Sequence, residues 1–555
     1  MFCLNLRNQV SKEIFLQEIE EYEMEESLLS QVSQQNAIPT KSKPSPSKHV
    51  RLHSLDVVRG ITIAVMILVD EIGAAYPVVN HSPWNNITFA DFVMPWFLFM
   101  VGTSASFSLR KFKQDNASRW RGTRYVTIRA FKLFGLGVLL QGGGWFGDPG
   151  FQMYGYNLSM IRWCGILNRI GYAYFFVGLI EIWISEIDIV HPKLKNNPHI
   201  TVFVQHGKKW GIAGIFVLLH LVLTFATYVP SWTSEWGHNA TVNSVSSVLL
   251  NEPFLVECNK KGYATTLTPE CSAAGYYDRI LFGQNHLGNW MSTRLPECSS
   301  CSPGQPDRYR PTCKYKYDGP NWCFANIYDP EGALATIPTV MSAWLGTHYG
   351  RVLKHTIHSN GARFQPTSII KHWSFLSGVL IALGLLVHFT FFKMNKQLWS
   401  TSYLFFMAGT CGACLTVVYA LIDAPPARSM NAAQFRHGSG PPLSSSLSPK
   451  WSSTIKTFFS PMQYMGMNAI LIFFWHGTAE SLLDVLYVQQ PKIGGGYESE
   501  IKGYLFGEGD GWFNSVVLGS MMNPNAAQLV YVLLKIGLYS IAMWYCYRIG
   551  YFWKI

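Results

Sequence analysis

The sequence predicts an all-α polytopic membrane protein, a bundle of about 10 (10–11) transmembrane helices with a disulfide-rich lumenal or extracellular loop. Of its 555 residues, 48% are hydrophobic and only 14% are charged, whereas a soluble chain has about 25% charged residues. The apolar residues are also gathered into runs that reach the roughly 20 residues needed to cross the hydrocarbon core. The ten predicted spans are 55–76, 89–109, 126–145, 166–185, 210–229, 333–353, 373–392, 398–423, 464–488 and 527–549.

Helices explain these runs better than barrel strands do. Only helices and closed barrels satisfy every backbone hydrogen bond inside a bilayer. The runs are long and lack the strict alternation of barrel strands, which indicates helices. An apolar segment at 510–522 is too short to span by itself and would be an eleventh element.

The first fifty residues differ from the rest of the chain. Residues 1–50 are polar and contain an acidic run, and they lack the pattern of a signal peptide. This composition predicts a disordered cytosolic tail. Residues 51–555, which include the loop at 230–332, are predicted to form one membrane-embedded domain.

Positive charge in the loops predicts the orientation. The loop between the second and third spans has one acid, Asp115, and six basic residues: Arg110, Lys111, Lys113, Arg119, Arg121 and Arg124. Basic loops stay in the cytosol, and the other even-numbered loops are basic too. Both termini are therefore expected in the cytosol. The net charge of +11 sets topology, and no basic-aromatic patch indicates a nucleic-acid partner.

The longest loop, 230–332, is predicted on the opposite side of the membrane. It holds six of the eleven cysteines: Cys258, Cys271, Cys298, Cys301, Cys313 and Cys323. An even number of cysteines outside the cytosol predicts disulfides, with fifteen pairings open. Zinc at Cys298 and Cys301 is the rival interpretation, but no second pair has finger spacing. Asn239 opens a glycosylation sequon. An endolysosomal, vacuolar or plasma membrane would place this loop correctly.

Ionisable residues near the membrane are the first functional candidates, because they are costly to bury there. Asp56 and Arg59 are three residues apart and can pair at the cytosolic entrance. Asp70, His81 and Asp91 are predicted near the lumenal face. A histidine beside carboxylates suits proton transfer. The alternative is a loop histidine bonded to a backbone carbonyl.

The ninth predicted span contains a second histidine with an acid on the same helix face. His476 and Glu480 are four residues apart, a spacing that fits a metal half-site or a proton relay. No second pair with matching spacing exists, so we expect no metal.

Short motifs lie across the chain from residue 51 to the C-terminus. They are residues 51–60, 81–85, 90–97, 167–171, 278–283 with His286 and Leu287, 328–332, 395–400, 466–468 with His476, and 552–555. In sequence and in order, these motifs resemble heparan-α-glucosaminide N-acetyltransferase and its relatives.

The resemblance implies that residues 51–555 form a transmembrane acyltransferase domain, an enzyme that uses cytosolic acetyl-CoA to acetylate a lumenal amino sugar such as the terminal glucosamine of heparan-like glycans. The family's active-site histidine matches His81, which would be the catalytic base or the acetyl carrier. Asp70 stands where the family has asparagine, which loosens the expectation for the acceptor. We also expect the family's long N-terminal lumenal domain to be missing. The predicted substrate-binding residues are Asp70, Asp91, Trp84, Asn85, Arg169, His286, Glu331, Asn468 and His476.

Several alternatives stay open. Basic residues near the cytosolic face either attract the phosphates of acetyl-CoA or only set topology: Arg110, Lys111, Arg124, Arg129 and Lys132. Intramembrane charges also suit a multi-pass transporter of a small polar solute, although the pattern at 91–96 does not recur in residues 300–555. A receptor or scaffold that uses the cysteine loop is a third class. A homodimer is compatible with the sequence.

Overall fold

The structure is a computed structural model. It describes residues 52–73, 76, 78–113, 115–141, 161–187, 198–234, 254–258, 267–288, 322, 327–358, 366–424, 449–483, 487–489, 502–504 and 523–553. The chain divides into two units, Met1–Arg51 and Leu52–Ile555, and every described residue belongs to the second. The predicted tail at 1–50, the segment 510–522 and the sequon at Asn239 lie outside the described residues.

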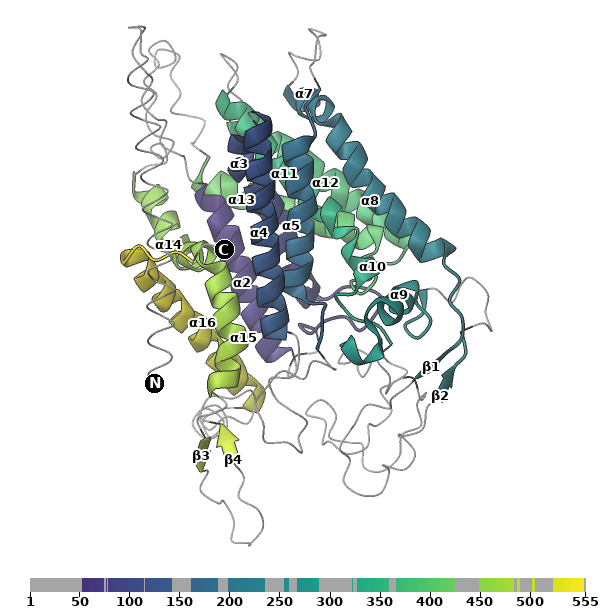
Figure 1. Cartoon of the computed structure of the whole chain (residues 1–555). Coiled ribbons are helices and arrows are strands. Elements are labelled where there is room, and N and C mark those ends of the chain that lie inside the picture. The colour runs from purple at the N-terminus through teal and green to yellow at the C-terminus, as the bar shows by residue number, and fades with distance from the viewer. Residues whose placement is uncertain are drawn as a thin grey trace. The chain divides into compact units, whose positions relative to one another are not determined.

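The described part is mostly helical (Figure 1). Its first half contains α2 (His53–Ile72), η1 (Phe89–Phe92), α3 (Val93–Ser108), η2 (Arg110–Phe112), α4 (Asn116–Gln141), α5 (Ile166–Trp183), α7 (Pro198–Gln205) and α8 (Gly207–Ala226). Its second half contains α9 (Ala273–Phe282), η4 (Gln284–His286), α10 (Ala333–Thr336), α11 (Thr339–His358), α12 (Pro366–Thr390), α13 (Thr401–Ile422), α14 (Pro449–Met467), α15 (Ala469–Leu483) and α16 (Pro524–Arg548). The helical class predicted from the sequence is confirmed.

Five stretches of described helix are long and apolar enough to cross a membrane by length and composition. They are Phe89–Ser108, Gly207–Ala226, Thr367–Thr390, Thr401–Ile422 and Asn525–Arg548. These helices support a multi-pass membrane protein. Each of the ten predicted spans overlaps a helix, but a total of about ten crossings stays a prediction.

Two predicted spans are each divided between two helices: 333–353 contains α10 and part of α11, and 464–488 contains part of α14 and α15. A single helix was expected over 464–488, but the structure has α14 and α15, with a break at Asn468. The side chain of Asn468 accepts a hydrogen bond from Trp553 N (3.1 Å) and donates one to Tyr551 O (3.1 Å). An asparagine that binds the backbone of another segment competes with regular helix, so this break depends on the chain's C-terminal end.

The helices pack in close pairs. The most extensive are α12 with α13, α3 with α11, α2 with α14, and α4 with α5, which run side by side in Figure 1. Gly60 on α2 and Gly466 on α14 make one close approach possible. A Cβ on Gly60 would collide with Met462 O, and one on Gly466 would collide with Asp56 O. Small residues let membrane helices come this near.

The described part of the predicted lumenal loop contains two short strands and one disulfide. Strands β1 (Trp232–Ser234) and β2 (Phe254–Val256) pair antiparallel, and a disulfide joins Cys258 to Cys271. These cysteines pack with Trp84, Ile327 and Tyr328 in one hydrophobic cluster. The other four cysteines of the loop lie outside the described residues. A second antiparallel pair is β3 (Tyr487–Gln489) with β4 (Lys502–Tyr504).

A buried ionic group lies near the end of α5. Glu181 is 1% exposed and contacts Lys113 Nζ (2.6 Å), Lys209 Nζ (3.2 Å) and Arg351 Nη2. These cations come from the α3–α4 connection, α8 and α11. The group therefore ties four parts of the bundle at one point. The predicted pair of Asp56 and Arg59 on α2 is also present, at 3.4 Å.

Candidate active site

His81 and Asp91 form an imidazole–carboxylate pair between α2 and α3. His81 Nδ1 lies 2.9 Å from Asp91 Oδ1, and the Asp91 side chain is fully buried. The other carboxylate oxygen, Oδ2, accepts hydrogen bonds from Ser82 N (3.2 Å), Thr88 N (3.0 Å) and Thr88 Oγ1 (3.0 Å). These local bonds fix the carboxylate at the start of η1. They leave Oδ1 directed at the imidazole.

A third group, the ammonium of Lys396, joins this pair from 315 residues beyond His81 in the chain. Its ammonium Nζ lies 3.0 Å from His81 Nδ1 and 3.7 Å from Asp91 Oδ1. Below, the His81 centre means His81, Asp91 and Lys396. The sequence placed Lys396 in a family motif but did not mark it as a site residue. The contact spans too many residues for any local pattern to reveal it.

The segment that carries Lys396 is firmly anchored beside the loop that carries His81. Asn86 N donates to Met394 O (2.8 Å), and Asn85 pairs with Asn395 as an isolated bridge. Within the segment, Leu398 N donates to Asn395 Oδ1 (2.8 Å). The predicted site residue Asn85 therefore lies where the two segments meet.

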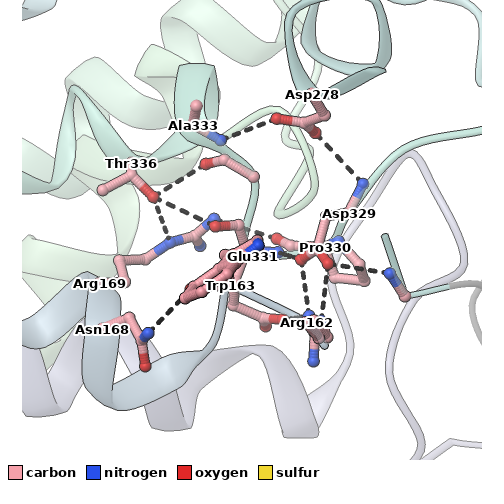
Figure 2. Close-up of polar contacts among 12 residues, drawn as sticks. Arg162, Trp163, Asn168, Arg169, Asp278, Asp329, Pro330, Glu331, Ala333 and Thr336 are labelled. Atoms are coloured by element: carbon pink, nitrogen blue, oxygen red, sulfur yellow. Dashed lines mark hydrogen bonds and ion pairs between the residues drawn. The ribbon is translucent and has the colours of Figure 1, made fainter. Parts of the chain in front are cut away.

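A second polar cluster lies mainly in the segments that precede α5 and α10 in the chain, and it is drawn in Figure 2. Arg162 donates from Nε and Nη2 to the two oxygens of Asp329, each at 2.6 Å, and also contacts Glu331. Burial opposes the charge of Arg162, but Asp329 and Glu331 outweigh it and raise the pKa of the guanidinium. Gly288 N also donates to Asp329 (2.9 Å).

Arg169 and Asp278 complete this cluster (Figure 2). Arg169 is 1% exposed, and it donates to Thr336 Oγ1 and to Pro330 O, both at 3.1 Å. Asp278 on α9 accepts from Asp329 N (3.2 Å) and Ala333 N (2.8 Å). Below, the Arg162 network means Arg162, Arg169, Asp278, Asp329 and Glu331.

Burial and the nearby charge of Asp329 raise the pKa of Asp278 to about 7. Gly332 makes this close packing possible, because a Cβ at that position would collide with the Asp278 carboxylate. The carboxylate is thus packed against the backbone of residues 329–333. Ionisation of this buried carboxyl group near neutral pH therefore costs free energy.

The start of α13 connects the two clusters. The Arg169 guanidinium lies over the Trp399 ring at 5.0 Å, and Trp399 packs edge-on against Tyr403. Tyr403 Oη donates to Asp91 O at 2.6 Å. One short segment therefore contacts His81, Asp91 and Arg169.

Trp84 makes a second connection, with its ring 5.0 Å from Tyr328 and its Nε1 donating to Leu267 O (2.9 Å).

The structure places the remaining predicted residues in different surroundings. His286 Nδ1 is 2.6 Å from Ile161 O, next to the Arg162 network. His476 lies 3.8 Å from both Asp70 Oδ2 and Glu71 Oε1, and Glu71 pairs with Lys535 of α16. Asn468 binds the C-terminal segment, as described above. A substrate-binding role for Asn468 and His476 stays a prediction.

No group of three or more His, Cys, Asp and Glu side chains within the described ranges is arranged to hold a metal ion. The predicted pairing of His476 with Glu480 cannot be examined, because the Glu480 side chain lies outside the described set.

The comparisons with known proteins agree with the resemblance found in the motifs. A family model described as heparan-alpha-glucosaminide N-acetyltransferase, catalytic, matches residues 51–185. The human heparan-alpha-glucosaminide N-acetyltransferase is 24% identical over 437 residues, which are 78% of this chain and 53% of the human protein. The mouse protein is 24% identical over 439 residues, 78% of this chain and 54% of its own length. The chain thus spans about half the length of these relatives.

Proposed function

From its confirmed resemblance to the heparan-α-glucosaminide N-acetyltransferase family, we propose that this chain is a membrane-bound N-acetyltransferase. It would move the acetyl group of cytosolic acetyl-CoA to an amino sugar on the other side of the membrane. The acceptor class and the acetyl donor come from what the relatives are named for and from the family, so both belong to the proposal. The orientation, with both termini in the cytosol, belongs to it as well.

The contact between His81 Nδ1 and Asp91 Oδ1, at 2.9 Å, is the observation that carries this proposal. It lies inside the region that the catalytic family model matches. A carboxylate at Nδ1 favours the tautomer with its proton on that nitrogen, which leaves the Nε2 lone pair for chemistry. A histidine held in this way can take a proton from an amine or attack an acyl carbon.

In the general-base route, the neutral amine of the sugar attacks the thioester carbonyl carbon. The carbon–sulfur bond breaks, coenzyme A leaves as the thiolate, and His81 Nε2 takes the proton that the amine loses. That proton then passes to the thiolate, which gives the amide and the free thiol. In the carrier route, Nε2 itself attacks the thioester carbonyl carbon, the carbon–sulfur bond breaks, and the leaving thiolate takes up the proton that the acetylated ring gives up from Nδ1. The amine then attacks the acetyl carbon, the bond between that carbon and Nε2 breaks, and the proton that the amine loses returns to the imidazole.

Acetyl transfer in membranes tests the proposal. Membranes that contain the full chain should transfer label from acetyl-CoA to glucosamine, and His81→Ala should lower the rate by about 10²-fold or more. His53→Ala is the matched control, because His53 is exposed at the other end of α2. Wild-type membranes without acetyl transfer, or His81→Ala with the wild-type rate, would contradict it.

Trapping distinguishes the two routes. Labelled acetyl-CoA without acceptor should leave label on the protein only if His81 carries the acetyl group. Loss of that label in His81→Ala assigns it to this residue. Label that is absent in the active wild type selects the general-base route. Uptake of a polar solute without acetyl transfer would favour the transporter alternative instead.

A further inference from the structure

The ammonium of Lys396 lies beside the His81 ring, where its effect on the protonation of His81 opposes that of the Asp91 carboxylate. Its ammonium is 3.0 Å from the same ring nitrogen, His81 Nδ1, that faces the carboxylate. Lys396 is 5% exposed, so water screens this charge poorly. Tyr403 also lies close to the centre, and its hydroxyl donates to Asp91 O.

The nitrogen Nδ1 cannot serve both neighbours at once. It either donates its proton to Asp91 or accepts one from Lys396. The first arrangement gives the reactive tautomer, with Nε2 unprotonated. In that arrangement the ammonium makes no hydrogen bond to the ring, and it acts on His81 through charge alone.

The two charges then work in opposite directions on the protonation of His81. A carboxylate favours the imidazolium, and an ammonium disfavours it. With Asp91 alone, the imidazole would hold a second proton up to a higher pH, and a protonated ring cannot act as base or nucleophile. An ammonium at 3.0 Å offsets this effect.

We propose that Lys396 is a positioning residue that keeps His81 neutral while Asp91 fixes its tautomer, and so extends acetyl transfer to lower pH. This inference builds on the proposed function and deepens it. It assigns Lys396 a role in the pH range of the reaction, with no direct contact to the reacting atoms.

Hydrogen bonds within residues 395–400 fix the backbone that carries Lys396. Asn395 N donates to Ser400 Oγ (3.0 Å), and Ser400 N donates to Asn395 O (3.0 Å). Trp399 has φ 47°, a left-handed conformation that a non-glycine residue adopts only at some cost. This compact turn holds the Lys396 backbone in place beside His81.

Labelling of His81 itself tests the inference. Diethyl pyrocarbonate reacts with unprotonated imidazole, so the extent of His81 modification, measured by mass spectrometry across about pH 5 to 8, follows its protonation. In Lys396→Met, the midpoint of His81 labelling should move up by about one pH unit or more. The lower pH limit of acetyl transfer should move with it.

Three variants keep the experiment decisive. Lys396→Arg retains the charge and should keep the wild-type midpoint. Lys393→Met removes an exposed lysine from the same segment and should change nothing. Lys396→Gln keeps a hydrogen-bond donor without charge, and it replaces Lys396→Met if that variant fails to accumulate. In each sample the labelling of His53 reports on the reagent.

The outcomes are separable from those of the proposed function. A His81 midpoint that stays fixed or moves down in both uncharged variants overturns the role of Lys396, even if the chain transfers acetyl groups. An upward shift in a chain that transfers no acetyl group supports the charge effect and overturns the proposed function alone.

Discussion

Arg162 holds Asp329 through two parallel hydrogen bonds, from Nε and Nη2, each 2.6 Å long. This two-point contact joins the segment before α5 to the segment before α10. Glu331 contacts the same guanidinium, so one cation serves two buried carboxylates. The network thereby fixes how the described part of the predicted lumenal loop sits on the helices that carry Arg169 and Thr336.

Removing the Arg162 guanidinium should therefore destabilise the protein strongly. Arg162→Met leaves the carboxylates of Asp329 and Glu331 buried without their cation, and breaking a buried ion pair in this way costs about 3–5 kcal/mol. Thermal unfolding of the detergent-solubilised chain measures the loss. Arg162→Lys should recover only part of it, because an ammonium cannot make the planar two-point contact. Arg121→Met, at an exposed position, is the control, and equal melting temperatures for the two methionine variants would refute the prediction.

Replacing the Asp91 carboxylate by an amide should remove activity and leave the fold largely intact. In Asp91→Asn the oxygen can still accept from Ser82 and Thr88, which directs the amide NH₂ at His81. That donor requires Nδ1 to accept and moves the ring proton to Nε2, the wrong nitrogen for base or nucleophile. Acetyl transfer should fall by about 10²–10⁴-fold.

Asp115→Asn is the matched control for this amide substitution. Asp115 is an exposed carboxylate that accepts from Ser118 N at the start of α4. The control should keep the wild-type rate. An Asp91→Asn enzyme that transfers acetyl groups as fast as this control would show that the carboxylate does not set the tautomer of His81.

Asp278 gives the protein a pH-dependent stability of definite sign. Its pKa in the folded protein is raised to about 7 from an ordinary value of 3.8, first by burial and then by Asp329. Between these two values the folded state holds a proton that the unfolded state has lost, so this residue's contribution to stability falls as pH rises. From pH 5.5 to pH 7 the loss is about 2 kcal/mol.

The difference between wild type and Asp278→Asn isolates this contribution from those of the other titrating groups. The amide does not titrate, so the melting temperature of the wild type relative to Asp278→Asn should fall between pH 5.5 and pH 7.5. Differential scanning fluorimetry at both pH values measures it. A difference that stays constant or grows with pH would contradict the raised pKa of Asp278.

The sequence predicts the local parts of this molecule well and the long-range parts poorly. Long apolar runs locate the helices, because helix hydrogen bonds form within the run itself. His81 and Asp91 are ten residues apart, so the capped start of one span brings them together. Lys396 reaches the same pair from another part of the fold, and no periodicity in the sequence encodes that contact.

The other features missed from the sequence have the same cause. Arg162 and Asp329 are 167 residues apart, and each alone reads as a loop charge near a membrane face. The break at Asn468 depends on the backbone at Tyr551 and Trp553, far along the chain. Tertiary contacts of this kind override the local preference for one continuous helix.

The buried ionic group around Glu181 should stabilise the end of the bundle that is predicted to face the cytosol. Glu181→Gln leaves Lys113, Lys209 and Arg351 converging without their shared carboxylate, and Lys209 is fully buried. The loss should be about 3–5 kcal/mol. Glu186→Gln should cost only about 0–1 kcal/mol, because the Glu186 side chain is 46% exposed and its contacts with His206 (3.4 Å), Lys113 (3.6 Å) and Lys209 (3.9 Å) are long.

A second substitution should repair part of the damage from the first. Arg351→Met added to Glu181→Gln removes one of the converging cations, so the double variant should melt at a higher temperature than Glu181→Gln alone. Residues in one ionic network couple in this non-additive way. If the two changes add, or if Glu186→Gln costs as much as Glu181→Gln, the buried carboxylate is not what balances these cations.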